Sequence, residues 1–218
     1  MAEDVRVIVF AQAPVPGSAK TQLIPALGAL GAALLARRLL ENTLAAVIGA
    51  RLGPVELCMS PDPGADEWRS VTLPARVERT AQGDGGPGAR LARAAERGIA
   101  DSGRAMIVGT DCPGMSAILL RAAAAALADT GSVIVRSADG GYALLGLSRY
   151  DDLLFRGIPW GTGGVATAFV RRFEHLGWPL HVGRTLHEVD EPRHLLHLPS
   201  SWLQAVRKGL VSREWHTP

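Results

Sequence analysis

The sequence predicts an α/β fold with one mostly parallel, mixed sheet that is covered by helices on both faces. Short runs rich in Val, Ile and Leu are apolar at every position rather than at alternate positions, and helical stretches separate these runs. Strands that are apolar throughout are buried on both faces, as in parallel sheets with helical crossovers. The chain has 218 residues, of which 47% are apolar and 20% are charged, so it can form one such domain. We expect this domain to cover residues 1–198.

The order of these runs defines the expected elements. The predicted strands are Val5–Phe10, Val55–Met59, Val77–Thr80, Ala105–Gly109, Ser132–Arg136, Ala143–Leu147 and Leu180–Val182. The predicted helices are Gly31–Ile48, Gly88–Asp101, Ala117–Ala128, Val165–Leu176 and Pro192–Leu196. Residues 199–218, which include Trp202 and Trp215, are expected to form a tail with a docked helix and a frayed end.

Composition excludes several classes of protein. The formal net charge of +2 and the scattered arginines do not provide the concentrated basic surface that nucleic-acid binding requires. No apolar run approaches the roughly 20 residues that span a bilayer, and an acidic N-terminus leads directly into the first strand without a signal peptide. The two cysteines are too far apart to suggest a disulfide framework. We therefore expect a cytoplasmic protein with neither nucleic acid nor a membrane as partner.

The loop after the first strand has the layout of a phosphate-binding loop. An apolar run opens directly into Pro14, Pro16 and Gly17, and Lys20 follows before a helical stretch. In open parallel sheets ligands bind beyond the carboxyl ends of the strands, and a lysine there can reach a phosphate as a point charge. The alternative is a proline-rich turn with a solvated lysine.

A second loop at a strand end is rich in glycine. Residues 81–88 contain four glycines and lead into a helix, so the backbone around Gln82 and Gly83 could approach a ligand closely. A flexible connection explains the same composition equally well.

Asp111 lies at the tip of a buried strand. A carboxylate in this position is costly to desolvate unless it meets a cation, and Mg²⁺ held by one or two carboxylates and by substrate phosphates is a common solution. Alternatively, Asp111 caps the helix that begins near Ser116 or shapes the turn before Pro113. The spacing is long for a cap, which favours the metal.

Three further features follow later strands. Asp139 begins an Asp-Gly-Gly-Tyr motif that could be a hairpin turn between two strands, and Asp190 could be the N-cap of a short helix with Pro192 in its first turn. Trp160 lies in a Gly/Pro loop, where it could stack on a sugar or a base, or cover the apolar end of the sheet. The joint occurrence of these motifs at successive strand ends favours a binding site.

Other chemistries find less support. The six histidines do not have the spacing of zinc ligands, and we expect them at the surface or in helix caps. A hydrolase is disfavoured because the sequence has no Gly-x-Ser-x-Gly elbow, and Cys112 has no evident histidine partner.

The motifs together resemble those of bacterial glycosyltransferase-A-like transferases of the arsenosugar-biosynthesis glycosyltransferase type. This group is related to molybdenum-cofactor and 2-phospholactate guanylyltransferases. The resemblance covers residues 5–196 and rests on five motifs in order: Ala13–Thr21 (APVPGSAKT), Gly109–Pro113 (GTDCP), Ala138–Tyr142 (ADGGY), Gly157–Thr162 (GIPWGT) and Val189–Pro192 (VDEP).

The resemblance implies a nucleotide-diphospho-sugar transferase fold with the nucleotide in the N-terminal half. It also implies that Asp111 and Asp190 hold Mg²⁺ or Mn²⁺. The candidate catalytic residues are Asp111 and Asp139, of which Asp139 would contact the sugar or the acceptor and could act as a general base. The candidate nucleotide- and phosphate-binding residues are Ala11, Gln12, Pro16, Gly17, Lys20, Gln82 and Gly83. The candidate residues for the acceptor or the sugar are Gly140, Gly141, Tyr142 and Trp160.

The chain departs from the family pattern at three positions. Gln12 and Gln22 stand where the family usually has Lys and Arg, and Ala138 replaces an acidic residue. The loop therefore has two positive charges fewer for stabilising phosphates. The leading hypothesis is transfer of a sugar from a nucleotide-sugar to a small acceptor. The alternatives are nucleotidyl transfer from a nucleoside triphosphate to a phosphorylated or acidic molecule, and a weakened relative that only binds nucleotides.

Overall fold

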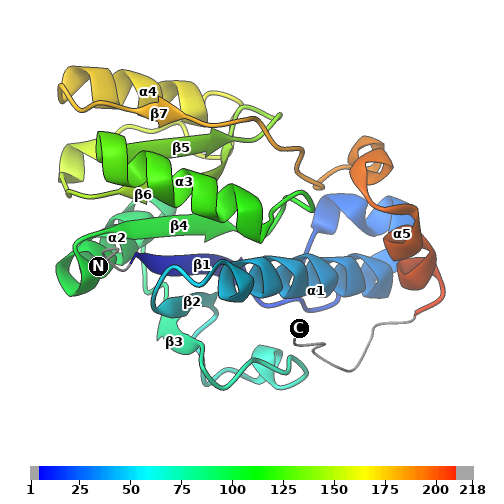
Figure 1. Ribbon diagram of the computed structural model, residues 1–218. Helices are drawn as coiled ribbons and strands as arrows, with labels where there is room; N and C mark the ends of the chain where they lie inside the picture. The colour runs from blue at the N-terminus through cyan, green and yellow to red at the C-terminus, as the bar shows by residue number, and fades with distance from the viewer. Residues whose placement is uncertain (1–4, 210–218) are drawn as a thin grey trace.

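A computed structural model describes residues 5–209 of the chain. Within these residues the strands form one sheet in the order β3-β2-β1-β4-β6-β5-β7 (Figure 1). The strands are β1 (Arg6–Gln12), β2 (Val55–Ser60), β3 (Glu78–Ala81), β4 (Ala105–Gly109), β5 (Ser132–Arg136), β6 (Tyr142–Leu147) and β7 (His181–Val182). Each predicted strand is present, with its ends within two residues of the prediction.

The sheet is mixed, as the sequence predicts. β1 pairs in parallel with β2 and β4, and β2 with β3. β6 is antiparallel to both of its neighbours, β4 and β5, and β5 pairs in parallel with β7. The reversal at β6 leaves β4 and β5 with the same direction, so both end at the edge of the sheet where β1 ends.

Helices cover both faces of the sheet. They are α1 (Ile24–Ala50), α2 (Pro87–Ser102), α3 (Ala117–Thr130), α4 (Val165–His175) and α5 (Ser200–Arg207). Alternate residues of β1 enter two separate cores: Val7 and Val9 pack in the core that contains α1 and α3, while Ile8 packs in the core that contains α2 and α4. This arrangement explains why the strand is apolar at every position.

The helix α1 begins earlier than predicted. Gly28 has φ 71° and ψ 165°, which interrupts the helix one turn after its start at Ile24. Only a glycine adopts this conformation without strain. The regular part of the helix therefore lies after Gly28, close to the predicted start at Gly31.

The segment Thr21–Ala50 corrects one expectation from the sequence. By length and composition it is apolar enough to cross a membrane, with a mean hydropathy of 1.6, although no such run was expected. A core helix of a globular domain has the same properties. Here Leu35, Leu39, Leu40 and Leu44 are buried in the protein.

The C-terminal part of the chain packs against α1. In α5, Trp202, Leu203 and Val206 contact a small core that includes Leu35 and Leu39, and Arg38 lies 5.0 Å from the centre of the Trp202 ring. The helix predicted at Pro192–Leu196 is a short 3-10 helix, η4 (Pro192–His197). Trp215 lies outside the described residues.

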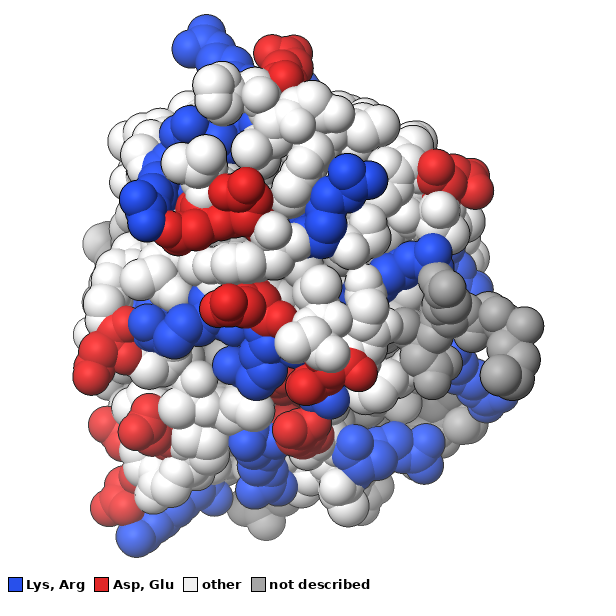
Figure 2. Space-filling view, turned by 90° about the vertical axis from the view of Figure 1, so that its left-hand side faces the viewer, with Lys and Arg blue, Asp and Glu red and all other residues white. Residues whose placement is uncertain are grey.

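The charges are dispersed over the end of the molecule where the parallel strands begin. Figure 2 shows basic and acidic side chains interspersed over this face, without a large patch of one sign.

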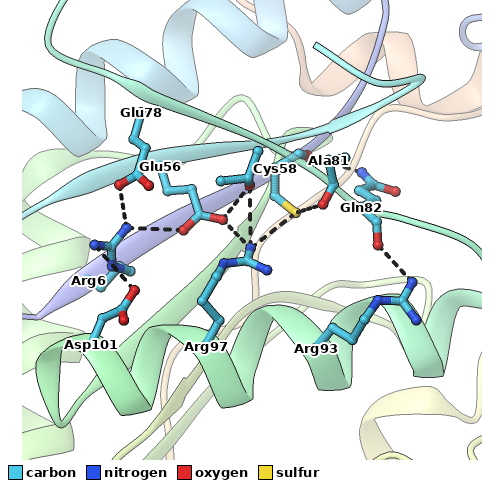
Figure 3. Close-up of polar contacts among 10 residues, drawn as sticks. Arg6, Glu56, Cys58, Glu78, Ala81, Gln82, Arg93, Arg97 and Asp101 are labelled. Atoms are coloured by element: carbon cyan, nitrogen blue, oxygen red, sulfur yellow. Dashed lines mark hydrogen bonds and ion pairs between the residues drawn. The ribbon is translucent and has the colours of Figure 1, made fainter.

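A buried carboxylate joins three strands to α2. Glu56 is fully buried in β2 and accepts hydrogen bonds from Arg6 Nη1 at 3.2 Å, from Thr80 Oγ1 at 2.6 Å and from Arg97 Nη2 (Figure 3). Arg6 belongs to β1, Thr80 to β3 and Arg97 to α2. The hydrogen bonds of Glu56 therefore connect β1, β2 and β3 to α2.

Substitution of Glu56 should show this role. Glu56→Ala leaves Arg6 and Arg97 without their buried partner, and loss of one member of such a cluster costs about 3–5 kcal/mol of unfolding free energy. Glu78→Ala is the control, because Glu78 pairs with the same Arg6 but its side chain is 55% exposed. This control should cost about 1 kcal/mol or less. Equal losses in urea denaturation would contradict the prediction.

Candidate functional site

Two cavities adjoin at the carboxyl ends of the parallel strands. The first has a volume of about 410 Å³ and the second about 630 Å³. Both are lined by Asp111 and Asp190, together with Phe10 and Gln22. The two carboxylates therefore lie where the cavities meet.

The first cavity contains most of the predicted nucleotide-binding side chains. Ala11, Gln12, Lys20 and Gln82 line it, whereas Pro16, Gly17 and Gly83 do not. Among its described lining residues, Lys20 alone carries a positive charge, and Gln12 and Gln22 offer neutral amides.

The backbone of the opening loop directs Lys20 into the cleft. The amides of Ser18 and Ala19 donate to the carbonyl of Val15 at 3.2 and 3.0 Å, and Gly17 has a φ of 87° within this turn. Lys20 itself has φ 48° and ψ 47°, a left-handed conformation that is uncommon for a residue with a side chain. Such strain is found most often at functional positions.

Lys20 forms ion pairs with both aspartates. Its Nζ donates to Asp111 Oδ1 and to Asp190 Oδ1, the latter at 2.5 Å, and its side chain is only 9% exposed. Burial alone would lower the pKa of Lys20, but the two carboxylates outweigh burial and raise it. Burial and the charge of Asp111 raise the pKa of Asp190, while Lys20 opposes this shift.

Backbone amides on both sides of Asp190 fix its position. The amide of Val189 donates to the carbonyl of Asp111 at 2.9 Å, which fixes the chain just before Asp190 beside the end of β4. His194 Nδ1 then accepts from the amides of Asp190 and Glu191 at 3.4 and 3.3 Å. This contact confirms the expected role of a histidine in capping.

The alternative roles of the two aspartates as helix caps are wrong. Ser116 caps α3, since its side chain accepts from the amide of Leu119, and Glu191 is the N-cap of η4. Neither Asp111 nor Asp190 caps a helix, and both line the two cavities.

The two aspartates have the donor chemistry of a Mg²⁺ or Mn²⁺ site. Such ions take carboxylate oxygens and complete their coordination with water and substrate phosphates. Within residues 5–209, no group of three His, Cys, Asp or Glu side chains has the arrangement of a metal site made by protein alone. The fit of Asp111 and Asp190 to such an ion rests on the chemistry of their carboxylate oxygens.

Gln82 has a structural role in addition to its place in the first cavity. Its Nε2 donates to the carbonyls of Ala11 and Cys58 at 3.0 and 3.2 Å, and so ties the ends of β1 and β2 together. Arg93 Nη2 donates to the Gln82 carbonyl at 2.8 Å and also contacts the Asp84 carbonyl. The glycine-rich loop is therefore fixed to α2 rather than being a free connection.

The second cavity contains most of the predicted acceptor residues. Asp139, Gly141, Tyr142 and Trp160 line it, and Gly140 does not. Asp139 also shapes the hairpin between β5 and β6, because its Oδ1 accepts from Ser137 Oγ and from the amide of Gly141. The turn interpretation of this motif is confirmed, and its part in binding stays a prediction.

Two aromatic residues form the apolar wall of this cavity. Tyr142 and Trp160 each contact Phe169 edge-to-face, with centroid distances of 5.5 and 5.8 Å. Burial raises the pKa of the Tyr142 phenol. Trp160 is half-buried, so it partly covers the sheet end and partly faces the cleft.

Sequence reasoning missed Glu188. Its side chain is 4% exposed, it lines the second cavity, and its Oε2 has no hydrogen-bond partner in the described part of the chain. The signal in the sequence is its place two residues before Asp190 in an extended segment, where alternate side chains share a side. Cys112 also lines this cavity, and burial raises the pKa of its thiol.

Comparison with known proteins places the chain in a family. Residues 43–162, more than half of the chain, match the family described as "Uncharacterized protein conserved in bacteria (DUF2064)". The chain belongs to this family. Its matched region contains Asp111, Asp139 and Trp160. Curated proteins with significant similarity to this DUF2064 member were not found.

Solved structures show the fold of this DUF2064 protein. A protein from Desulfovibrio desulfuricans G20, provisionally named a nucleotide-diphospho-sugar transferase, superposes with a TM-score of 0.81 at 23% identity over 97% of this chain and 100% of its own. The 2-C-methyl-D-erythritol 4-phosphate cytidylyltransferase of Thermus thermophilus gives 0.52 at 17% identity over 94% and 99%. Rv0371C of Mycobacterium tuberculosis H37Rv in complex with manganese gives 0.51 at 17% over 89% and 97%. The predicted fold is thereby confirmed.

Two glycines of the second cavity's loops allow a matched test of its geometry. Gly140 has φ 90°, and a Cβ there would lie 2.0 Å from the carbonyl oxygen of Gly163; Gly161 has φ 75° and nothing within 4 Å. Gly140→Ala should therefore destabilise the protein by about 3 kcal/mol or more through overpacking and strain. Gly161→Ala should cost about 1 kcal/mol from backbone strain alone. Similar midpoints in thermal unfolding would show that the two loops are not packed together as described.

Proposed function

We propose that this chain is a metal-dependent transferase that uses a nucleotide-sugar donor to glycosylate a small acceptor. The observation that carries this proposal is the meeting of two cavities at Asp111 and Asp190. The N-terminal loop lines one cavity, and the loops around Asp139 and Trp160 line the other. Two substrates can then meet at one carboxylate pair.

The first cavity suits the donor. It lies at the carboxyl end of β1, where open sheets bind nucleotides. Asp111 and Asp190 would hold a divalent cation, and Lys20 adds a positive charge beside them. A bound cation supplies charge neutralisation for the diphosphate of the donor. The manganese complex of Rv0371C, which has a similar fold, supports this choice of ion.

The second cavity suits the acceptor. In the proposed reaction an acceptor hydroxyl oxygen forms a bond to the anomeric carbon, and the bond between that carbon and the diphosphate oxygen breaks. The nucleoside diphosphate leaves with the electron pair, and the acceptor proton passes to a base. Asp139 is our candidate base, since Oδ1 is held by Ser137 and Gly141 and fixes the carboxylate in the cavity.

Nucleotidyl transfer is the competing function, because the Thermus cytidylyltransferase has the same fold. A nucleoside triphosphate brings more negative charge than a nucleotide-sugar. Lys20 alone, among the described residues that line the first cavity, provides a positive charge, and two carboxylates already pair with it. The electrostatics therefore favour the donor of lower charge.

Thermal stabilisation by nucleotide-sugars and nucleoside triphosphates, with and without Mn²⁺, tests the proposal. A ligand at 100 times its Kd stabilises the native state by about 2.7 kcal/mol. Asp111→Asn should lose the part of this stabilisation that depends on Mn²⁺. Asp66→Asn is the control, since Asp66 pairs with Arg69 on the surface and both side chains are more than 70% exposed.

The product formed decides between the functions. Release of a nucleoside diphosphate from a nucleotide-sugar supports glycosyl transfer, and release of pyrophosphate from a triphosphate supports nucleotidyl transfer. If Asp111→Asn retains the full Mn²⁺-dependent stabilisation, the carboxylate pair is not the metal site.

The two glutamines provide a second test. Gln12→Lys with Gln22→Arg adds two positive charges to the first cavity, so binding of a nucleoside triphosphate should tighten more than that of the matching nucleotide-sugar. A change of about tenfold at low salt is expected, and it should decline as the ionic strength rises. Calorimetric titration gives both affinities. Unchanged binding of both ligands at low salt would mean that this loop does not face phosphates.

A further inference from the structure

One side of the second cavity is strongly acidic. Its described lining has a single permanent positive charge, Arg193, whose Nε lies 2.7 Å from Glu191 Oε2 and whose side chain is 74% exposed. Its carboxylates are Asp111, Asp139, Glu188, Asp190 and Glu191. Lys20 pairs with Asp111 and Asp190 from the first cavity, and Arg193 pairs with Glu191, so five carboxylates face two cations among the described residues.

Among these carboxylates, Glu188 has a buried oxygen without a hydrogen-bond partner in the described part of the chain. Its side chain is 4% exposed, and Oε2 has no hydrogen-bond partner among residues 5–209. A buried polar atom without a partner is costly, and it is retained where a ligand provides the missing donor. Glu188 therefore indicates that the occupant of this cavity presents a hydrogen-bond donor.

A side chamber extends the cavity past Glu188. It has a volume of about 310 Å³, and Asp139, Glu188, Arg193 and His194 line both spaces. The chamber also includes His187 and His197, whose rings stack at 4.0 Å. Imidazoles and carboxylates together can both donate to and accept from a molecule with several hydroxyl groups.

The same cavity also has an apolar part, which Phe10, Leu91, Tyr142 and Trp160 line. A cavity that combines aromatic surface with hydrogen-bond acceptors matches a compact polyol, which has C–H faces and hydroxyl edges. A phosphate or carboxylate would instead be placed beside Asp139 and Glu188, where like charges repel.

We infer that the second cavity takes a hydroxyl-rich acceptor without negative charge, and that Glu188 accepts a hydrogen bond from it. This inference rests on the proposed function, because it assigns the acceptor class of the same site. It argues against a phosphorylated or acidic acceptor. An amino group in place of a hydroxyl satisfies the same carboxylates.

The test uses three probes that share one sugar ring and differ in charge: glucose, glucosamine and glucose 6-phosphate. Ligand-observed NMR titration of the full chain gives their affinities in the presence of Mn²⁺ and saturating inorganic pyrophosphate, which occupies the phosphate-binding cavity. We expect glucose and glucosamine to bind at least tenfold more tightly than glucose 6-phosphate. Glu188→Gln should weaken both about tenfold, and Glu174→Gln on the exposed side of α4 should leave them unchanged.

A second measurement concerns the protein without ligand. Glu188→Gln replaces a nearly buried carboxylate, whose Oε2 has no partner among the described residues, by a neutral amide of the same shape, so the Tm should rise by about 2–4 °C. A fall in the Tm would show that Glu188 already has a partner and would overturn the inference. Preferential binding of glucose 6-phosphate, or binding of none of the three probes, would also overturn it.

The two proposals can fail separately. Pyrophosphate and Mn²⁺ are first titrated alone, and lack of binding there contradicts the proposed function. Binding of pyrophosphate together with tight binding of glucose 6-phosphate would leave the metal-dependent transferase standing and refute only the acceptor class.

Discussion

The ion pairs of Lys20 with Asp111 and Asp190 hold the cleft together. They join Lys20 in the loop after β1 to Asp111 at the end of β4, which is 91 residues further along the chain. They also join Lys20 to Asp190 in the segment before η4, which is 170 residues further along. Two carboxylates in partial burial would repel each other without a cation, as the raised pKa of Asp190 indicates. The ammonium group of Lys20 therefore permits the cleft to form before any ligand arrives. A divalent ion would compete with this ammonium for the same oxygens.

The reversal of β6 gives the cleft its second cavity. In an all-parallel sheet the loop after β5 would lead into a crossover helix. Here β5 turns directly into β6, and the hairpin that contains Asp139 stays at the carboxyl edge beside Asp111. The chain then returns through α4 and β7, and a bridge between Ser137 and Leu186 leads the last segment toward Asp190. The residues that line the two cavities therefore share one carboxylate pair, Asp111 and Asp190.

Two buried carboxylates of the chain, Glu56 and Glu188, have different surroundings. Glu56 binds β1 and β3 to α2 at the buried side of the strands, where its oxygens are satisfied by Arg6, Thr80 and Arg97. Glu188 is almost as inaccessible but keeps one oxygen without a partner among the described residues. A buried carboxylate whose oxygens are hydrogen-bonded, such as Glu56, is typical of a structural role, and one with an unpartnered oxygen, such as Glu188, is typical of a site that a ligand completes. The two residues are similarly buried, so their hydrogen-bond partners distinguish them.

The strand positions, the fold class and most of the residues of the candidate site could be predicted from the sequence alone. Apolar runs such as Ala105–Gly109 specify buried strands, and the rule that ligands bind beyond strand ends leads directly to Lys20, Asp111 and Asp190. Only the tertiary structure decided that Gln82 ties two strands together, that Gly140 lies outside the cavity lining, and that Glu188 lies inside it. Local patterns reveal which residues are polar and where strands end. The partner of a side chain, or its lack of one, depends on segments distant in sequence, whose packing no local pattern specifies.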